Sequence, residues 1–378
     1  MRNAASSWEK EYAEKLVSEG YTRGKAAPTT FYNRDKDSRC VVHGDDFTFL
    51  AEEEELQRMS KLMAEWYEIK VRATMGPDPQ DDKEVVILGR TVRWLEDRNE
   101  YEADDKYVKL ICEEMGLNET SKGLDGPSEK DDPEDEADDE DLNKEEAKEF
   151  RRIAATANYL ASDRPDIQYA TKEICRSMSR PKRKSWNKLK RLARYLLKHP
   201  RLIFEYFAKD ELEDMYLEVY SDSDWAGCLK TRKSTSGGMA SIGGGMLRSW
   251  SSTQATVAMS SGEAEYYAMV KAASEALGIQ ALAADLGWHL KVRLWVDSTA
   301  AKSIASRTGL GRVRHLEVRF LWLQEVVRKG RLMLRKIPGE KNPADILTKP
   351  KNAADMILKL VPVGVELRSR EIAVKRVI

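Results

Sequence analysis

Four short motifs in the C-terminal half of the chain each carry an acidic residue that could bind a metal ion. These residues are Asp222, Glu265, Asp297 and Asp345. Each follows a strand-like run or lies in the first turn of an expected helix, and such positions meet at one edge of a sheet. Clustered carboxylates repel one another unless divalent cations neutralise them, and Mg²⁺ prefers oxygen ligands. Since pairs of these ions serve enzymes that cut phosphodiesters, the motifs predict a site for two Mg²⁺ ions, with Mn²⁺ as a substitute.

Each acidic residue also fits an ordinary structural role when it is taken alone. Asp222 fits a turn, Glu265 fits a position that favours the helix dipole, and Asp345 fits a helix cap. Four such residues in order, each within its own motif, favour a common site over separate structural roles.

The elements that must hold these residues alternate in type between residues 214 and 350. Three strands come first, and strands and helices then follow in turn. This order predicts an α/β fold in which helices pack on a sheet. The expected strands cover residues 215–220, 237–242, 246–252, 294–296 and 332–337. The expected helices cover residues 262–286, a short run through 304, residues 313–328, and a segment that opens at Asn342-Pro343.

The N-terminal part of the chain contains a predicted hairpin over residues 40–50. Its glycine-containing turn carries Asp45 and Asp46 at the tip. The pattern then predicts an amphipathic helix over 52–69, a strand run over 85–94 that one glycine interrupts, and a helix over 105–115.

Charge is distributed unevenly although the net charge is only −1. Residues 120–149 are strongly acidic and predict a disordered linker, which either acts as a plain spacer or binds a basic partner. Residues 180–201 contain ten Lys or Arg and no acid, with apolar residues at helical spacing. We expect one face of this helix to pack and the other to contact nucleic-acid phosphates through Lys184, Lys188 and Arg191, the alternative being an ordinary solvated face.

Composition excludes several classes of protein. A length of 378 residues suggests two or three domains. No apolar run approaches the roughly 20 residues that span a bilayer, and the N-terminus is polar, so neither a membrane protein nor a signal peptide is expected. The cysteines are far apart and form no CxxC pair, which argues against structural zinc and disulfides. We therefore expect an intracellular protein of the cytoplasm or nucleus. The cysteines are Cys40, Cys112, Cys175 and Cys228.

Residues 214–350 resemble the RNase H domain of copia-type (Pseudoviridae) retrotransposon Pol polyproteins. The matching motifs lie at residues 220–228, 231–237, 249–254, 257–266, Asp297, Arg314-His315 and 342–350. The upstream chain resembles the reverse transcriptase of the same polyproteins more loosely. Val42-His43-Gly44-Asp45-Asp46 stands where the family has Tyr-Val-Asp-Asp, and residues 150–167 and 192–196 resemble the segment that joins polymerase to RNase H.

The resemblance implies an RNase H-like mixed five-stranded sheet with flanking helices, preceded by a partial α+β palm and connection region. It implies Mg²⁺-dependent cleavage of the RNA strand of an RNA–DNA hybrid. Asp222 would bridge two ions, Glu265 would hold the ion on the leaving-group side, and Asp297 and Asp345 would complete the ligation. Residues that could contact the hybrid are Thr231, Arg232, Ser234, Thr235, Ser251, Gln254, Arg314 and His315. Structural roles on a half-exposed hairpin, or at a helix start for His315, are the alternative.

The resemblance also suggests a division of the chain. The expected regions are 1–119, a partial reverse transcriptase; 120–149, the linker; 150–209, a basic helical connection; 210–350, the RNase H-like domain; and 351–378, a tail. A polymerase needs another palm aspartate, so Asp45 and Asp46 are expected to be vestigial and polymerase activity lost. The expected partners are nucleic acid and the rest of a Pol polyprotein, within a virus-like particle for an intact element. Two other functions stay open: an inactive nucleic-acid-binding remnant, and an interaction protein built around the acidic segment.

Overall fold

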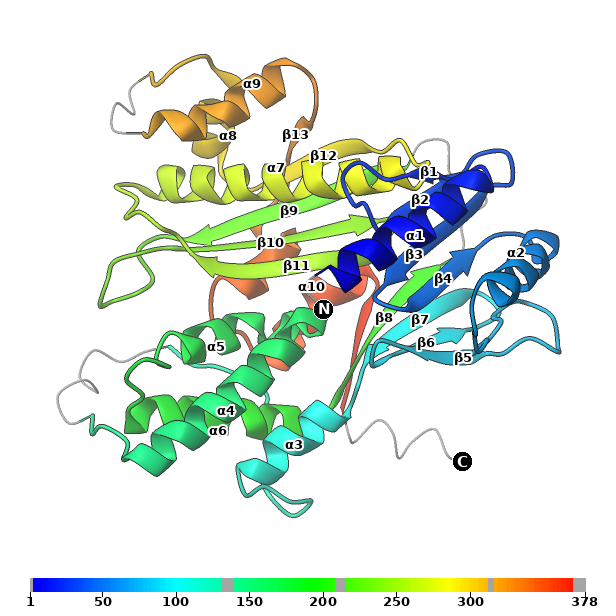
Figure 1. Ribbon diagram of the computed structural model, residues 1–378. Helices are drawn as coiled ribbons and strands as arrows, with labels where there is room; N and C mark the ends of the chain where they lie inside the picture. Colours follow the sequence, from blue (N-terminus) through cyan, green and yellow to red (C-terminus); the bar gives the residue numbers. More distant parts are fainter. Residues whose placement is uncertain (1–2, 131–138, 208–214, 312–315, 370–378) are drawn as a thin grey trace. The chain divides into compact units, whose positions relative to one another are not determined.

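The computed structural model describes residues 3–130, 139–207, 215–311 and 316–369. By internal contacts the chain forms two compact units (Figure 1). The first unit joins Met1–Thr74 to Ser274–Lys291, and the second joins Met75–Ala273 to Val292–Ile378. Within the described ranges, no helix has the length and apolar character needed to cross a membrane.

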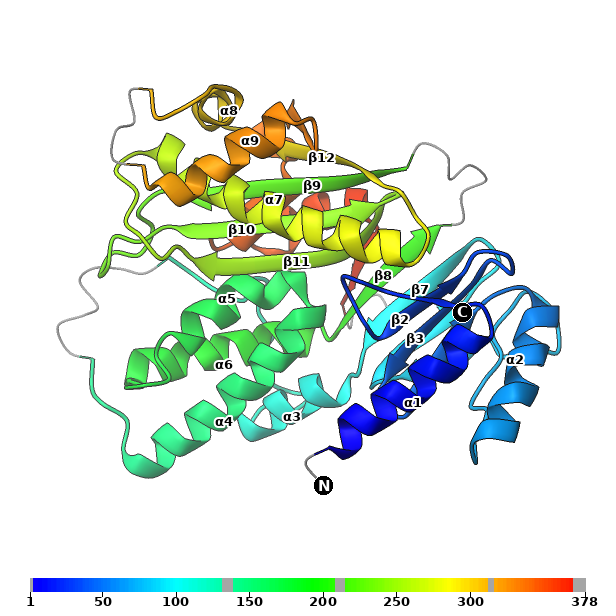
Figure 2. The same ribbon diagram turned by 45° about the horizontal axis from the view of Figure 1, so that its top comes forward.

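The first unit is a four-stranded antiparallel sheet with helices packed against it. The sheet order is β1-β2-β3-β4, and Figure 2 shows α1 lying along β2 and β3. The predicted hairpin over 40–50 and the helix that follows it are confirmed as β3, β4 and α2. Leu16, Phe31 and Met59 are almost fully buried in the core. The elements are α1 Ala4–Ser18, β1 Thr22–Arg23, β2 Thr30–Asn33, β3 Ser38–His43, β4 Asp46–Leu50 and α2 Glu53–Trp66.

An antiparallel sheet of the second unit has the order β14-β8-β7-β6-β5. The strand run predicted over 85–94 is a hairpin, because Leu88 and Gly89 both adopt positive φ angles (50° and 75°) and form a tight turn. The strands are β5 Glu84–Ile87, β6 Arg90–Trp94, β7 Arg98–Ala103, β8 Arg201–Phe207 and β14 Val365–Arg368.

The expected tail over 351–378 is not a tail in its described part. Helix α10 (Ala353–Leu360) buries Met356 and Leu360, and β14 pairs with β8 in antiparallel register from Val365 opposite Phe204. The apolar side chains of this segment fill the same core as the preceding helices, which explains why it folds back.

Four helices of the second unit share that core. Helix α4 begins at Lys144, inside the predicted linker, because Asn143 and Glu146 form a capping box at its start. The described structure therefore shortens the linker at this end, while residues 131–138 lie outside the described ranges. Helix α6 buries the expected apolar face, including Leu189, Leu192 and Leu196. The helices are α3 Lys106–Glu114, α4 Lys144–Leu160, α5 Pro165–Cys175 and α6 Arg183–Lys198.

The other sheet of the second unit is mixed and five-stranded, with the order β11-β10-β9-β12-β13. Strands β9, β10 and β11 are antiparallel, whereas β12 and β13 are parallel. This agrees with the strands, the long helix and the mixed sheet expected from the sequence. The strands are β9 Tyr216–Asp224, β10 Thr235–Ile242, β11 Gly245–Thr253, β12 Lys291–Val296 and β13 Met333–Lys336.

The connections carry helices of unequal length. The helix predicted over 313–328 is shorter, with a 3₁₀ turn at Val318–Leu321 before α9, and its first residues lie outside the described ranges. The segment that opens at Asn342-Pro343 forms the 3₁₀ helix η5 rather than an α-helix. The helices are α7 Ser261–Asp285, α8 Thr299–Ser306, α9 Trp322–Arg328 and η5 Pro343–Leu347.

A buried ion pair fixes α5 and α6. The Arg164 guanidinium donates to both oxygens of Asp166 at 2.9 and 2.6 Å, and both side chains are almost fully buried. Tyr195 of α6 donates to Asp166 at 2.9 Å, and Arg164 also donates to the carbonyl oxygens of His199 and Pro200. Buried charges are tolerated only when they are paired and hydrogen-bonded in this way.

The Asp166→Ala substitution is expected to destabilise this unit by about 3–5 kcal/mol, because it leaves the Arg164 charge buried without its partner. The milder Tyr195→Phe substitution removes one hydrogen bond and is expected to cost about 1 kcal/mol. Urea denaturation of each variant measures both free energies of unfolding. Equal costs for the two substitutions would contradict this account of the ion pair.

Candidate active site

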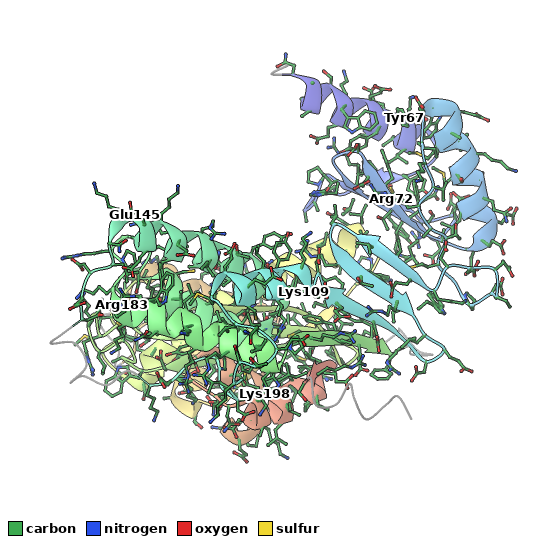
Figure 3. The ribbon with its side chains drawn as sticks, turned by 90° about the horizontal axis from the view of Figure 1, so that it is seen from below. Tyr67, Arg72, Lys109, Glu145, Arg183 and Lys198 are labelled. Atoms are coloured by element: carbon green, nitrogen blue, oxygen red, sulfur yellow. The ribbon has the colours of Figure 1, made fainter. Side chains whose placement is uncertain are left out.

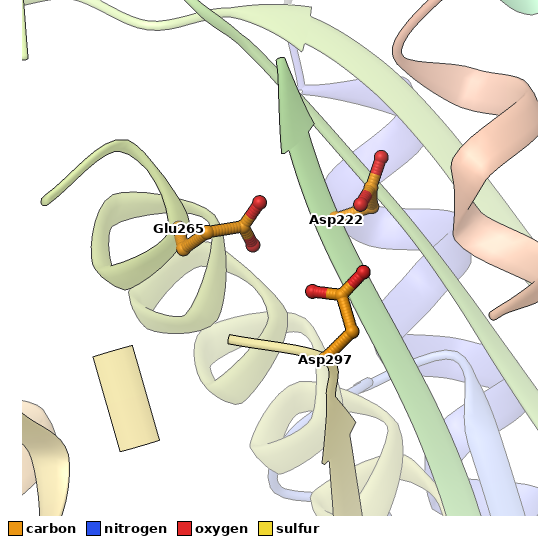
Figure 4. Close-up of side chains that lie close together, drawn as sticks. All are labelled: Asp222, Glu265 and Asp297. Atoms are coloured by element: carbon orange, nitrogen blue, oxygen red, sulfur yellow. The ribbon is translucent and has the colours of Figure 1, made fainter. Parts of the chain in front are cut away.

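Three of the four predicted carboxylates meet at the mixed sheet of the second unit. Asp222 comes from β9, Glu265 from the start of α7, and Asp297 from the residue after β12 (Figure 4). Each offers an oxygen, and these oxygens all lie within 4.8 Å of one another. Asp222 does not end its strand as expected, because β9 continues pairing with β10 as far as Asp224 opposite Thr235.

Asp222 is held in a nearly closed setting, with only 4% of its surface exposed. The Thr348 hydroxyl donates to its carboxylate, and Asn342 Nδ2 donates to the neighbouring Ser221 carbonyl at 2.9 Å. Gly237 permits this approach, because a Cβ there would lie 2.8 Å from side-chain atoms of Leu347 and Thr348.

Burial raises the pKa of Asp222 to about 7. The charges of Asp297 and Asp345 raise it further, whereas the Thr348 hydrogen bond and the Lys349 charge oppose the rise. Burial, followed by repulsion from Asp222 and Asp297, raises the pKa of Glu265 to about 9. Burial also raises the pKa of Asp297. The three groups therefore cannot all carry their charge cheaply without a cation.

Glu265 supplies the observation that fits a metal ion. Its Oε1 accepts a hydrogen bond from the Ser223 backbone nitrogen at 3.2 Å, whereas its Oε2 is buried and has no hydrogen-bond partner. An unpartnered buried carboxylate oxygen beside two other carboxylates is a suitable ligand for a hard divalent cation. Asp222, Glu265 and Asp297 are thus the residues that could hold Mg²⁺ or Mn²⁺.

Asp345 lies close by but has other partners. It is 8% exposed in η5 and forms ion pairs with Lys349 and with Lys351, the latter at 2.6 Å. Burial alone would raise its pKa, but the hydrogen bonds from the two lysines outweigh burial and lower the pKa. The structure therefore gives this carboxylate lysine partners and leaves it outside the group of three.

Thr348 and Lys349 are site residues that sequence reasoning did not select. Both lie in the Asp345-Ile346-Leu347-Thr348-Lys349-Pro350 motif, three and four residues after Asp345. That spacing was the available signal, since a helical turn returns such residues to the same face.

Several of the residues expected to contact a hybrid make hydrogen bonds within the protein. Ser251 Oγ donates to the Leu347 carbonyl at 2.6 Å, and Gln254 Nε2 donates to the Ala264 carbonyl at 2.8 Å. Both contacts fit the structural alternative, and contact with a hybrid stays a prediction for both residues. Other predicted residues are engaged in the same way: Ser234 accepts from the Ala226 nitrogen, Thr235 accepts from Lys172, and Thr231 donates to Cys228 Sγ.

Three further predicted groups have separate outcomes. Arg232 is exposed and adopts a positive φ of 55°. Arg314 and His315 lie outside the described residues. Asp46 in the first unit pairs with Arg72 at 2.9 Å. Across the described ranges, no group of three metal-binding side chains includes Asp45 or Asp46.

Lys184, Lys188 and Arg191 of α6 line a cleft of about 680 Å³ in the second unit. Figure 3 labels Arg183 and Lys198 at the two ends of this helix. We call this cleft the basic groove, since its cationic side chains outnumber the acidic side chains Glu129, Asp139, Glu173 and Asp224. The cationic side chains are Lys130, Arg176, Arg180, Lys182, Lys184, Lys188, Arg191, Lys230 and Lys349. Asp224 and Lys349 also line the groove. Asp224 lies on β9, two residues after Asp222, and Lys349 pairs with Asp345, so the groove extends close to the carboxylates.

Comparison with known proteins shows which proteins the chain is similar to. Over 376 residues the chain is 25% identical to the retrovirus-related Pol polyprotein from transposon TNT 1-94 of Nicotiana tabacum, which covers 96% of the chain. It is 33% and 32% identical over 206 residues to the corresponding Pol polyproteins from transposons RE2 and RE1 of Arabidopsis thaliana. This chain is a homologue of transposon Pol polyproteins. No protein-family model matches it.

The Pol homologue corresponds to a limited part of these relatives. It spans 27% of the TNT 1-94 polyprotein, and the matches to the RE2 and RE1 polyproteins each span 14% of those proteins. The activities of the whole polyproteins are therefore matters of proposal for this chain.

The carboxylate group predicts an unusual dependence of stability on pH. Below about pH 4 the folded and unfolded chains both hold protons on Asp222 and Glu265. Above that pH the unfolded chain loses these protons first, because the folded-state pKa values are about 7 and about 9. The folded state then binds more protons, so its stability falls as pH rises towards about 9.

Thermal unfolding in EDTA at about pH 5, 7 and 9 measures this fall. The double variant Asp222→Asn and Glu265→Gln should be more stable than the parent at about pH 9 by at least about 2 kcal/mol, or about 4–8 °C in Tm. Excess Mg²⁺ should raise the Tm of the parent and leave that of the variant unchanged, because the ion binds the folded carboxylates. Equal responses of both proteins to Mg²⁺ would count against the site.

Proposed function

We propose that this Pol homologue hydrolyses the RNA strand of an RNA–DNA hybrid in a reaction that depends on Mg²⁺. The observation that carries the proposal is the convergence of Asp222, Glu265 and Asp297 within 4.8 Å, with one buried oxygen left unpartnered. The mixed five-stranded sheet that positions them is the arrangement expected of an RNase H-like domain. The similarity to transposon Pol polyproteins supports the same reaction class.

In this proposal the carboxylates hold the ions, and the protein positions the nucleic acid. Divalent ions supply charge neutralisation and a stronger water nucleophile at a phosphodiester. Asp222 is the central ligand, fixed by Thr348, while Glu265 Oε1 is oriented by the Ser223 nitrogen. Asp297 follows β12, the strand next to β9, and its side chain points toward the other two. The 2′-hydroxyl of an RNA strand bound beside these groups would provide the physical basis for choosing RNA over DNA.

The basic groove is the surface that would receive the phosphate backbone. Its nine cationic side chains come from the segment before α4, the connection between α5 and α6, α6 itself, and the loops after β9 and η5. Contacts of this kind position a duplex without reading its sequence. The groove therefore fits an enzyme that acts on many hybrids rather than on one target.

A nucleic-acid-binding remnant without catalysis is the second candidate. The observation that favours it is the pairing of Asp345 with two lysines, which leaves three carboxylates in the group where four were expected. Binding to a hybrid without cleavage in either Mg²⁺ or Mn²⁺ would identify this function.

Incubation of the full chain with a hybrid labelled on each strand tests the proposal. We expect cleavage of the RNA strand alone in Mg²⁺ and none in EDTA. Asp222→Asn should lower the rate by about a hundredfold or more, because it removes a central ligand worth several kcal/mol of transition-state stabilisation. Absence of cleavage by folded protein would refute the enzymatic function.

Matched aspartate variants locate the effect. Asp45→Asn and Asp46→Asn make the same chemical change in the first unit and should leave the rate unchanged. Asp345→Asn should lower the rate less than Asp222→Asn, because its carboxylate is already held by Lys349 and Lys351. Equal losses in the Asp222 and Asp345 variants would instead assign Asp345 a full ligand role.

A further inference from the structure

Acidic residues from the segment before α4 form ion pairs with cationic side chains of the basic groove. Glu129 Oε2 lies 2.6 Å from Arg191 Nη1, and Asp141 Oδ2 lies 2.5 Å from Arg180 Nη2. Asp139 accepts from the Lys184 backbone nitrogen at 2.9 Å, and its carboxylate lies 3.9 Å from Lys182 Nζ. Three acidic side chains thus lie beside the cationic groups of Arg180, Lys182 and Arg191.

Backbone pairing holds part of this acidic segment in place. The Arg183 nitrogen donates to the Glu140 carbonyl at 2.8 Å, and the Leu142 nitrogen donates to the Pro181 carbonyl at 3.2 Å. Asp141 and Lys182 form an antiparallel bridge. The side chains are therefore presented to the groove in a fixed register rather than by chance contacts of a coil.

The geometry resembles that of phosphate recognition. Arg180 donates from Nε and Nη2 to the Asp141 carboxylate at 2.5–3.1 Å, a bidentate arrangement. Arginine grips carboxylates and phosphates with the same fork of donors. A phosphodiester backbone in the groove would require the same donors, so the two anions compete.

The exchange is feasible because these pairs are accessible to water. Arg180 and Asp141 keep 77% and 47% of their side-chain surfaces exposed, and Glu129 keeps 61%. Exposed ion pairs are weak, since both partners are well hydrated when apart. A polyanion, which also releases its own condensed counterions on binding, can displace them.

We propose that Glu129, Asp139 and Asp141 are a built-in competitor that reduces the affinity of the basic groove for the phosphate backbone of nucleic acid. The inference rests on the proposed function only for the choice of ligand. It adds that this chain limits its own binding by internal neutralisation of Arg180, Lys182 and Arg191.

Binding of an RNA–DNA hybrid in EDTA, measured by fluorescence anisotropy over a series of salt concentrations, tests the inference without cleavage. The triple variant Glu129→Gln, Asp139→Asn and Asp141→Asn keeps the side-chain shapes and removes the three negative charges beside Arg180, Lys182 and Arg191. We expect about tenfold tighter binding at moderate salt. The slope of log K against log[salt] should steepen by about 2–3, since each added phosphate contact contributes about 0.9.

A control with the same change of net charge separates local competition from general attraction. Glu84→Gln, Asp97→Asn and Glu325→Gln neutralise acids paired with Arg93, Arg98 and Lys329, none of which lines the groove. Thermal unfolding of both variants checks that each is folded. A steeper slope in the groove variant alone supports the inference.

Two results would overturn it. Equal gains in both variants would assign the effect to net charge, and an unchanged slope in the groove variant would show that the acids do not compete. The outcome is independent of catalysis, because the assay contains no divalent ion. A protein that fails to cleave hybrid but shows the steeper slope would lose the proposed function and retain this inference.

Discussion

Mutual repulsion among three carboxylates is the constraint that the mixed sheet of the second unit must withstand. Asp222, Glu265 and Asp297 come from three different segments, and the burial of Asp222 and half-burial of the other two reduce the screening of their charges by water. The sheet resists their separation because β9 is paired along its whole length with β10 and lies next to β12. Protons relieve the repulsion up to the raised pKa values of about 7 for Asp222 and about 9 for Glu265, and a divalent ion would relieve it where these groups are ionised.

Local pattern was sufficient to predict most of the mixed sheet. Strand-like runs predicted the strands from β9 to β13, and the expected helix over 262–286 matches α7 closely. The carboxylates were found because each stood in its own motif beside such an element. Their exact neighbours were less predictable. Helical spacing places Thr348 near Asp345, but no periodicity predicts its contact with Asp222, 126 residues away.

Contacts between distant segments explain what the sequence pattern missed. Residues 120–149 were treated as a linker because acidic composition cannot build a core, yet Glu129 and Asp141 bind cations of the α6 region. The basic run was likewise assessed alone, so its face was expected to be open. Opposite charge on two separate segments joins them in the structure, and only the fold shows which residues face each other.

The pairing of β14 with β8 has a consequence for how this polypeptide can be divided. β8 precedes the mixed sheet in the chain and β14 follows it, so one antiparallel sheet encloses the other in sequence. A fragment ending at residue 350 would keep β8 but lose β14, so the edge of β8 would be unpaired and could pair with a second molecule. A protease that removed this end would thus leave a fragment prone to self-association rather than a stable monomer. The segment after Asp345, with α10 and β14, therefore belongs to the smallest fragment expected to fold without self-association.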